Sequence, residues 1–305
     1  METMSQYVFG VDIGGTTVKL GYFDAEGNVL DKWEIPTRKE DNGSRILPDI
    51  AAGIDRKDVA GVGVGAPGPV DSEGVIYKTA NLGWGVFSIK ETLENILKLP
   101  VMAGNDANVA ALGEMWKGGG QGYKDLVVVT LGTGVGGGII VNGKMLTGAN
   151  GAGGEIGHIH VEDDEQEACC GNRGCLEQYS SATGVTRLAK RKLEKTTQDS
   201  VLRTSTLSAK SVFDAVKAKD PVAMEIAEQF GQYLGEGLAA IACVTNPEAF
   251  VIGGGVSKAG PVLIDYIRPY YQKAVFHADR DVKFELATLG NDAGIYGAAK
   301  LVLDR

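Results

Sequence analysis

Cysteine, histidine and runs of basic residues are scarce in this sequence. Its 305 residues include four cysteines and three histidines, which is too few thiols for a disulfide framework and suits a reducing compartment such as the cytoplasm. The net charge is −9, which argues against nucleic acid or an anionic membrane as a partner. No apolar run approaches the roughly 18 residues of a membrane span, and we expect no signal peptide before Tyr7. We therefore expect a globular protein of the cytoplasm.

Glycine, by contrast, is abundant. The sequence contains 44 glycines, about twice the usual share. This excess predicts many tight turns and close approaches of the backbone to a ligand. The length of 305 residues is enough for two domains, each with a sizeable core.

One supersecondary pattern occurs twice, about 120 residues apart. A strand at 7–13 enters the glycine turn Gly14–Thr17 and is followed by strands at 18–23 and 29–33. A strand at 126–131 likewise enters Gly132–Gly134 and is followed by strands at 136–141 and 144–146, with Asn142-Gly143 as a hairpin signal. The repetition predicts two related domains.

The remaining segments alternate between strand and helix patterns, which predicts α/β sheets with parallel members. Strands are expected at 59–64, 101–103, 249–252 and 282–286, and helices at 88–97, 107–116, 184–195, 209–218, 222–244 and 293–303. Gly118–Gly122 interrupts the pattern as either an interdomain hinge or a surface loop. Within the helix 222–244, Gly231, Gly235 and Gly237 indicate close helix packing, inside the chain or across a dimer, and Cys243 is expected to be buried.

Three glycine turns follow apolar strands: Gly14–Thr17, Gly132–Gly134 and Gly253–Gly255. Glycine lets backbone N–H groups point at phosphate oxygens, and threonine hydroxyls add donors. Each turn alone is more typical of a structural turn, but three of them in a duplicated frame favour nucleotide binding. The dinucleotide fingerprint is excluded because no helix follows its two matches, and no P-loop motif occurs.

Carboxylates follow two of the expected strands. Asp12 ends the first strand, where it could hold Mg²⁺ or simply cap a turn. Asp106 lies between a short strand and a helix. It could serve as the N-cap of that helix, or accept a hydroxyl proton during phosphoryl transfer. The loops 65–71 and 81–84 are candidates for a pocket wall and a lid, or for ordinary turns.

Three of the four cysteines and two of the three histidines fall between positions 158 and 175. Thiolates, an imidazole and tight glycine turns in one segment are typical of a tetrahedral zinc site, although buried cysteines beside a core histidine are the alternative. Glu155 and Glu177 flank the cluster, so the metal would shape a binding site.

Together these motifs resemble a known family. Val11–Thr16 is similar to the first phosphate motif of actin-like sugar kinases, and Leu131–His158 with Cys170–Glu177 resembles the ROK (repressor, open reading frame, kinase) family. Segments 65–71, 81–84, 105–108, 114–117 and 289–294 look like the glucokinases of Gram-positive bacteria within that family. The resemblance implies two actin-like (ribonuclease H-like) α/β domains with a cleft between them, at residues 1–117 plus 295–305 and at 118–294, the latter with a zinc segment at 155–177.

The resemblance also implies ATP-dependent phosphorylation of glucose, with Asp106 as general base, Mg-ATP in the cleft and a structural Zn²⁺. Implied sugar contacts are Gly65, Asn81, Asn105, Asp106, Glu155, His158 and Glu177. Implied ATP and Mg²⁺ contacts are Asp12, Gly14, Gly15, Thr16, Thr17, Lys19, Thr133, Gly134, Gly254 and Gly255. A homodimer or homotetramer is expected, with neither nucleic acid nor membrane as a partner.

The zinc segment departs from the family pattern at one position. The family usually has Cys-x-Cys where this chain has Ala168 and the adjacent Cys169 and Cys170. His158, Cys170 and Cys175 match three ligands, and we expect Cys169 as the fourth, with His160 as the alternative. Another sugar is the main alternative to glucose: N-acetylmannosamine, fructose, mannose or allose. A non-catalytic sugar sensor is less well supported because Asp106 is present.

Overall fold

The computed structural model describes residues 7–56, 58–77, 79, 82–163 and 170–305, and these divide into two compact units. The first unit holds the chain up to Lys124 together with Gly138–Gly154 and Thr288–Arg305. The second holds Asp125–Gly137 and Glu155–Ala287. Residues 118–124, 138–154 and 288–294, which the family resemblance assigns to the second domain, are grouped with the first unit. No helix of the described residues is long and apolar enough to span a membrane.

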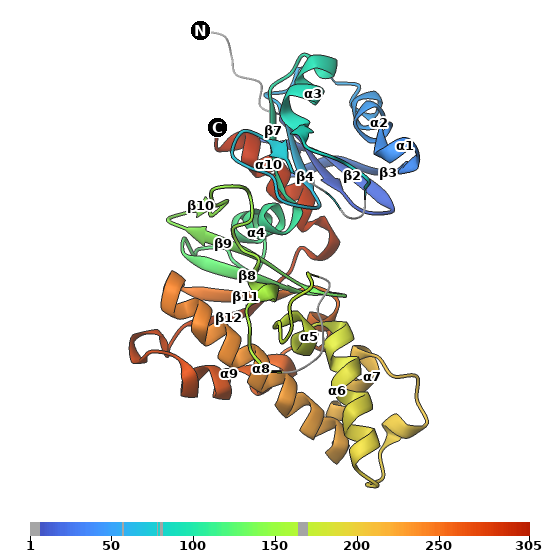
Figure 1. Cartoon of the computed structure of the whole chain (residues 1–305). Helices are drawn as coiled ribbons and strands as arrows, with labels where there is room; N and C mark the ends of the chain where they lie inside the picture. Colours follow the sequence, from blue (N-terminus) through green and yellow to red (C-terminus); the bar gives the residue numbers. More distant parts are fainter. Residues whose placement is uncertain (1–6, 57, 78, 80–81, 164–169) are drawn as a thin grey trace. The chain divides into compact units, whose positions relative to one another are not determined.

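Two five-stranded mixed sheets carry the fold, which confirms the predicted α/β class (Figure 1). The first has the order β3-β2-β1-β4-β7 and the second β10-β9-β8-β11-β12. The first sheet contains β1 (Tyr7–Ile13), β2 (Thr17–Asp24), β3 (Val29–Pro36), β4 (Val62–Ala66) and β7 (Val101–Asn105). The second contains β8 (Leu126–Leu131), β9 (Val135–Val141), β10 (Lys144–Met145), β11 (Ala249–Gly253) and β12 (Lys283–Leu286). A two-stranded ribbon joins β5 (Val75–Ile76) and β6 (Phe87–Ser88).

The two sheets have matching strand orders, which confirms the predicted repetition. In each, three strands that are consecutive in the chain are followed by two parallel strands, β4 and β7 or β11 and β12. Asn142 and Gly143 both have positive φ (52° and 72°), as a type I′ hairpin turn between β9 and β10 requires.

In the first unit, helices cover both faces of the sheet. These helices are α1 (Glu40–Gly43), α2 (Ile46–Gly53), α3 (Ile89–Leu97), α4 (Asp106–Lys117) and α10 (Ala293–Leu303). Phe9 and Val11 pack in one core cluster with residues of α2 and α3, whereas Val8 packs with Ile295 of α10.

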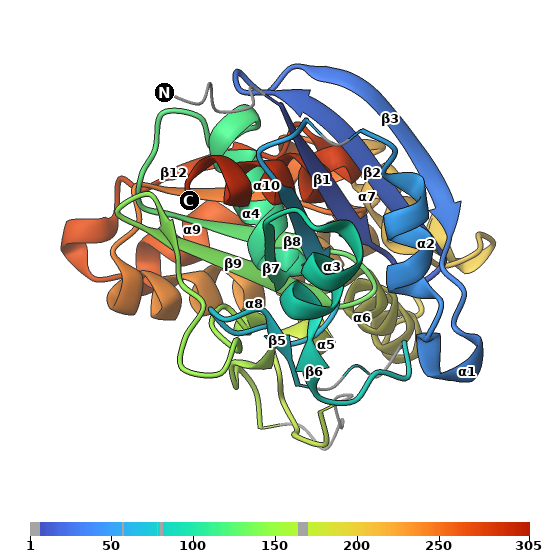
Figure 2. The same cartoon turned by 90° about the horizontal axis from the view of Figure 1, so that it is seen from above.

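Small residues let α10 lie close to the sheet and to α4 (Figures 1 and 2). Gly10 of β1 pairs in register with Gly63 of β4. A Cβ on Gly63 would lie 1.7 Å from the carbonyl oxygen of Ala298, and a Cβ on Gly297 would lie 1.7 Å from that of Val109. Backbone therefore packs directly on backbone along α10.

In the second unit the helices are α5 (Glu177–Ser180), α6 (Ala182–Lys195), α7 (Ala209–Lys217), α8 (Pro221–Thr245) and α9 (Val262–Ala274). Short 3₁₀ helices occur at Ile156–His158, Val201–Arg203, Val256–Ala259 and His277–Asp279, with a fifth, Gly290–Asp292, in the first unit.

The glycines of α8 pack inside the chain. A Cβ on Gly231 or Gly235 would lie within 3 Å of the α9 backbone, and Gly237 faces Leu176. The prediction of close helix packing is thus confirmed, and the partner is α9 of the same chain. The prediction that Cys243 is buried is wrong. Cys243 falls on the solvent stripe of α8 that also exposes Glu236 and Ala240, because these positions share one face at helical spacing.

Candidate active site

The carboxyl ends of β1, β4 and β7 lie at one edge of the first sheet, because the three strands run parallel. Asp12 pairs in register with Gly65, and Gly65 with Gly104. Asp12, the loop that follows β4 and the start of α4 therefore meet at this edge, which is where α/β sheets present residues to ligands.

Asp12 and Asp106 form the charged centre of this edge. Burial, followed by the negative charge of Asp106, raises the pKa of Asp12 to about 6, while the Lys19 ammonium acts to lower it. A buried carboxylate beside a second carboxylate is a donor set that a divalent cation prefers, because the charge of the cation relieves both burial and repulsion. The residues present therefore fit Mg²⁺.

Asp106 is the first residue of α4, and Asn105 is its N-cap. The Asn105 side-chain oxygen accepts from the backbone N–H of Asn108 at 3.1 Å, and its amide donates to the Gly68 carbonyl at 3.0 Å. One oxygen of the half-buried Asp106 carboxylate accepts from the N–H of Ala107 at 2.8 Å. Asn105 thus does the capping and also holds the 65–71 loop beside Asp106.

The first glycine turn is fixed by its own backbone. The N–H of Gly14 donates to the carbonyl of Thr17 at 3.0 Å, and the Thr37 hydroxyl donates to the carbonyl of Gly14 at 2.7 Å. Gly15 and Thr16 are exposed between these anchors, so their donors can reach a ligand. Lys19 pairs in register with Asp12, and its ammonium donates to the Asn291 carbonyl at 2.7 Å.

The other two glycine turns end adjacent strands of the second unit, since Gly253 of β11 pairs in register with Thr130 of β8. Gly254 has φ of 82°, and a Cβ there would lie 2.5 Å from the Leu131 backbone. A Cβ on Gly134 would lie 2.1 Å from a carboxylate oxygen of Glu177. Thr133 and Gly134 thus follow β8, and Gly254 and Gly255 follow its neighbour β11. The turn at Gly254 requires glycine, because a Cβ there would meet backbone.

The predicted metal ligands also converge. Candidate ligand atoms of His158, Cys170 and Cys175 all lie within 4.8 Å of one another, and the two sulfur atoms are 3.8 Å apart. Two thiolates on a tetrahedral zinc ion, with Zn–S bonds of about 2.3 Å, would have sulfurs about 3.8 Å apart. Nδ1 of His158 is buried without a hydrogen-bond partner among the described residues, which leaves it open to the ion. The three side chains fit zinc.

His160 is engaged elsewhere. Its Nδ1 lies 3.1 Å from the Arg173 carbonyl oxygen and its Nε2 lies 3.0 Å from a carboxylate oxygen of Asp163. Both ring nitrogens therefore lie within hydrogen-bond distance of an acceptor other than a metal ion. This arrangement favours Cys169 as the fourth ligand. Cys169 itself lies outside the described residues, as does Asn81, a predicted sugar contact.

The two flanking carboxylates are held by the zinc segment. An antiparallel bridge joins His160 to Cys175, and the N–H of Leu176 donates to the carbonyl of Ile159 at 2.8 Å. These contacts close the chain between the two carboxylates into a loop. Glu155 lies at the start of this loop, and Glu177 follows its end. A Glu155 oxygen lies 3.8 Å from Nε2 of His158, and a Glu177 oxygen accepts from the N–H of Val135 at 3.1 Å.

A family model described as ROK family matches residues 8–305. The chain belongs to the ROK family. It is 44% identical to a glucokinase of Halalkalibacterium halodurans, covering 97% of this chain and 95% of the relative. It is 32% identical to an N-acetylgalactosamine kinase of a Shewanella species, covering 96% of each chain. Among solved structures, the ROK family glucokinase of Streptomyces griseus in complex with glucose and AMPPNP is 36% identical with a TM-score of 0.77, covering 97% of this chain and 98% of that one.

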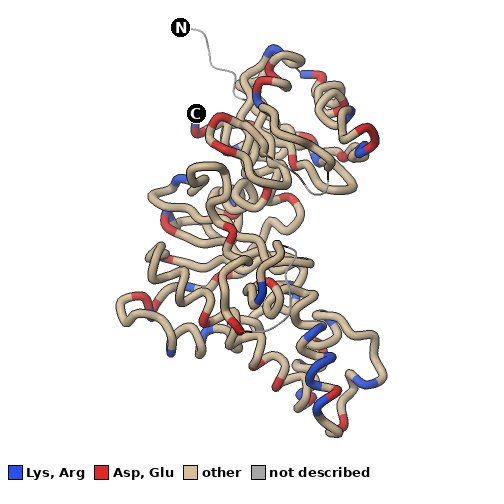
Figure 3. The backbone as a smooth tube through the Cα atoms, viewed as in Figure 1, with Lys and Arg blue, Asp and Glu red and all other residues tan. Residues whose placement is uncertain are grey.

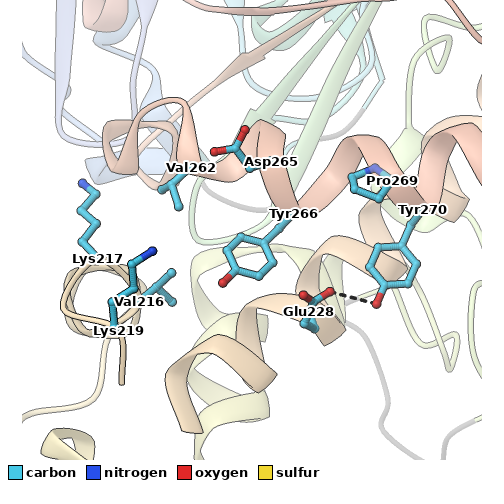
Figure 4. A pocket seen from close by; sticks show the side chains of 9 residues that line it. All are labelled: Val216, Lys217, Lys219, Glu228, Val262, Asp265, Tyr266, Pro269 and Tyr270. Carbon is cyan, nitrogen blue, oxygen red and sulfur yellow. Dashed lines mark hydrogen bonds between the residues drawn. The ribbon is translucent and has the colours of Figure 1, made fainter. Parts of the chain in front are cut away.

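A hollow on the second unit of this ROK protein contains none of the predicted site residues. It has a volume of about 600 Å³ and lies between the end of α7, the middle of α8 and the start of α9 (Figure 4). Tyr266 and Tyr270 of α9 line this hollow together with Glu228 of α8, and the Tyr270 hydroxyl donates to Glu228 at 2.9 Å. The predicted site residues lie instead at strand ends and in the zinc segment.

Two residues at the site were not singled out from the sequence. The Thr183 hydroxyl donates to the Thr133 carbonyl at 2.9 Å and so supports the second glycine turn. Asn108 is buried at the start of α4 and donates to the Gly153 carbonyl. Asn108 belongs to the quoted 105–108 motif, and its position about one helical turn from Asn105 is the available signal.

Proposed function

We propose that this chain transfers the γ-phosphoryl group of ATP to the 6-hydroxyl of glucose, giving glucose 6-phosphate and ADP. The observation that carries the proposal is the pair Asp12 and Asp106 at the carboxyl edge of the first sheet, where burial and then the charge of Asp106 raise the pKa of Asp12. Similarity over nearly the whole chain to glucokinases, including one solved with glucose and AMPPNP, supports the same reaction.

Asp106 acts as the general base. Its carboxylate accepts the proton of the sugar hydroxyl as that oxygen attacks the γ-phosphorus, and the bond to the β-phosphate oxygen breaks. Asn105 holds Asp106 in place by capping α4. When bound beside Asp12, Mg²⁺ would neutralise charge on the phosphate oxygens. The exposed donors of Gly15 and Thr16, and the turns at Thr133–Gly134 and Gly254–Gly255, bind phosphate and nucleoside.

The sugar hydroxyls are read by Asn105, Glu155, His158 and Glu177, with Gly65 on the pocket wall. His158, Cys170 and Cys175 would hold a structural zinc ion, which when bound would fix the segment between Glu155 and Glu177 as a clip. Ligation through Nδ1 of His158 leaves Nε2, 3.8 Å from Glu155, to donate to a sugar hydroxyl. Thiolate ligands of this kind are typical of a reducing compartment, which supports a location in the cytoplasm.

A second candidate substrate is an N-acetylhexosamine, favoured by the 32% identity to an N-acetylgalactosamine kinase. The deciding experiment is a coupled assay of ATP consumption over a panel of hexoses and N-acetylhexosamines. We expect the highest kcat/KM with glucose. A higher value with an N-acetylhexosamine, mannose, fructose or allose would reassign the substrate, and no sugar-dependent turnover would refute the kinase proposal.

The zinc clip is tested by metal analysis of purified variants. Cys170→Ser is expected to lose zinc and to lower sugar affinity, because one soft ligand is removed from the closed site. Cys243→Ser, at an exposed position on α8, is the matched control and should keep one zinc per chain. For the fourth ligand, Cys169→Ser should lose zinc and His160→Ala should keep it. The reverse pattern would make His160 the ligand.

A further inference from the structure

Asn108 is a buried polar residue of α4 that the proposed mechanism does not use. It is 1% exposed, and its backbone N–H is already satisfied by the Asn105 cap at 3.1 Å. Its side-chain amide donates to the Gly153 carbonyl at 3.0 Å, across 45 positions of sequence. Asn108 and Gly153 both belong to the first compact unit.

Gly153 lies in a tight loop at 147–154, which ends directly before Glu155. The N–H of Gly153 donates to the Thr147 carbonyl at 2.8 Å, which closes the loop on itself. Gly151 has φ of 79°, and a Cβ there would lie 2.5 Å from the Val70 backbone. The 147–154 loop is therefore packed against the end of the 65–71 loop.

The first turn of α4 thus holds two loops through two asparagines. Asn105 donates to Gly68 in the 65–71 loop, and Asn108 donates to Gly153 in the 147–154 loop. Asp106, the proposed base, stands between them in the sequence. The two side-chain amides therefore tie both loops to the helical turn that carries the proposed base.

Stability alone does not account for Asn108. Its side-chain oxygen is buried and has no hydrogen-bond partner within the described part of the chain. A buried acceptor without a partner costs free energy, and this cost offsets the stability gained from the single hydrogen bond to Gly153. An apolar side chain of similar size would avoid that cost and lose only the contact to the loop.

We propose that Asn108 is a positioning residue for the sugar site: through Gly153 it sets the 147–154 loop, which packs against the 65–71 loop beside Asp106. The inference rests on the proposed function, in which Asp106 is the base and Gly65 lines the sugar pocket. Asn108 touches neither sugar nor nucleotide. Its loss acts on glucose through the loop and leaves the nucleotide contacts intact.

The test compares Asn108→Leu and Asn108→Asp with the wild type. Leucine is of similar size without a donor, and aspartate keeps the shape but cannot donate to Gly153. Ile50→Val is the matched control, because Ile50 is fully buried in α2 of the same unit and belongs to no proposed site. Each protein is measured for glucose and ATP kinetics, thermal stability and hydrogen exchange of peptides spanning 147–154.

Both Asn108 variants should lower kcat/KM for glucose by roughly 10- to 100-fold, the effect of displacing a contact by about 1 Å. The KM for ATP should stay within about twofold of the wild type. Exchange should rise in the 147–154 peptide but not in α4, and the Tm of Asn108→Leu should be lowered no more than that of Ile50→Val. Unchanged glucose kinetics and exchange would overturn the proposal, as would equal losses for glucose and ATP that track Tm. If the wild type fails to phosphorylate glucose, the proposed function fails, while the exchange comparison still decides whether Asn108 holds the loop.

Discussion

Asp12 shows at the residue scale how a site is built at the expense of stability. Its carboxylate is mostly buried beside Asp106, and its pKa is raised from 3.8 to about 6. At neutral pH the folded chain therefore keeps a buried negative charge that water would stabilise better. A cation at this position would remove the penalty, and the same penalty gives the site its affinity for a cation.

This leads to a stability prediction for Asp12→Asn in metal-free buffer. The folded state holds a proton on Asp12 up to about pH 6, whereas the unfolded state releases it near pH 3.8. The contribution of Asp12 to the free energy of unfolding therefore falls as pH rises through this window. Asp12→Asn should be more stable than the wild type at pH 7.5, on the order of 1 kcal/mol, and not at pH 4.

Urea unfolding of both proteins at the two pH values, with chelator present, checks this expectation. The same variant should lose kinase activity at both values, because asparagine cannot provide the charge that holds Mg²⁺. If the difference in stability between Asp12→Asn and the wild type is the same at pH 7.5 and pH 4, the pKa of Asp12 is not raised as described.

At the scale of elements, glycine decides how closely helices approach. Gly297 of α10 and Gly113 of α4 face each other's backbone, and a Cβ on Gly113 would lie 2.2 Å from the carbonyl oxygen of Ala293. Because Asp106 begins α4 and Gly294 lies against Asp12, this packing also sets the geometry of the candidate site.

Gly297→Ala is therefore expected to lower the free energy of unfolding by about 3 kcal/mol, at the upper end of what overpacking costs. The Cβ would meet backbone, which cannot turn aside as a side chain can. Gly85→Ala is the control, because nothing lies within 4 Å of its added Cβ, and it should be near neutral. Chemical denaturation of both variants gives the comparison, and equal midpoints would contradict the close packing of α10 on α4.

The elements differ in how far sequence predicts them. The two hairpin units and the long helix α8 follow from periodicity and turn residues, and the structure has them. Helix α9 was missed because Pro261 and Pro269 lie at its start and inside it, and a proline inside a helical pattern normally indicates its end. Tertiary packing of Gly231 and Gly235 on α9 stabilises this helix, and that contact is not visible in a local window.

Much of the candidate site can also be predicted from local patterns in the sequence. Asp12, Asp106 and the glycine turns follow strands, so their common sheet edges could be inferred. His158, Cys170 and Cys175 stand out because those residue types are rare in the chain. Asn108 was not assigned a role because its partner Gly153 is 45 positions away, and no local pattern joins the two.

At the scale of the whole molecule, the proposed machinery is shared between two units with matching sheets. Asp12 and Asp106 belong to the first, and Thr133, Gly134 and Gly254 to the second. The overall charge is −9, yet Lys and Arg gather along α6 (Figure 3). Two of these bind within the unit, since Arg187 donates to the Gln178 carbonyl and Lys192 pairs with Glu225 of α8. The expected homodimer or homotetramer stays a prediction, which light scattering of the purified chain would check.

The most direct test is the product formed from glucose and Mg-ATP by the wild type and by Asp106→Asn, identified by phosphorus NMR. The wild type should form glucose 6-phosphate, and the variant should do so roughly 10²- to 10⁴-fold more slowly while binding glucose and ATP normally, because only the proton acceptor is lost. Glucose 6-phosphate formed at wild-type rate by Asp106→Asn, or none formed by the wild type, would contradict the assignment of Asp106 as the base of a glucose kinase.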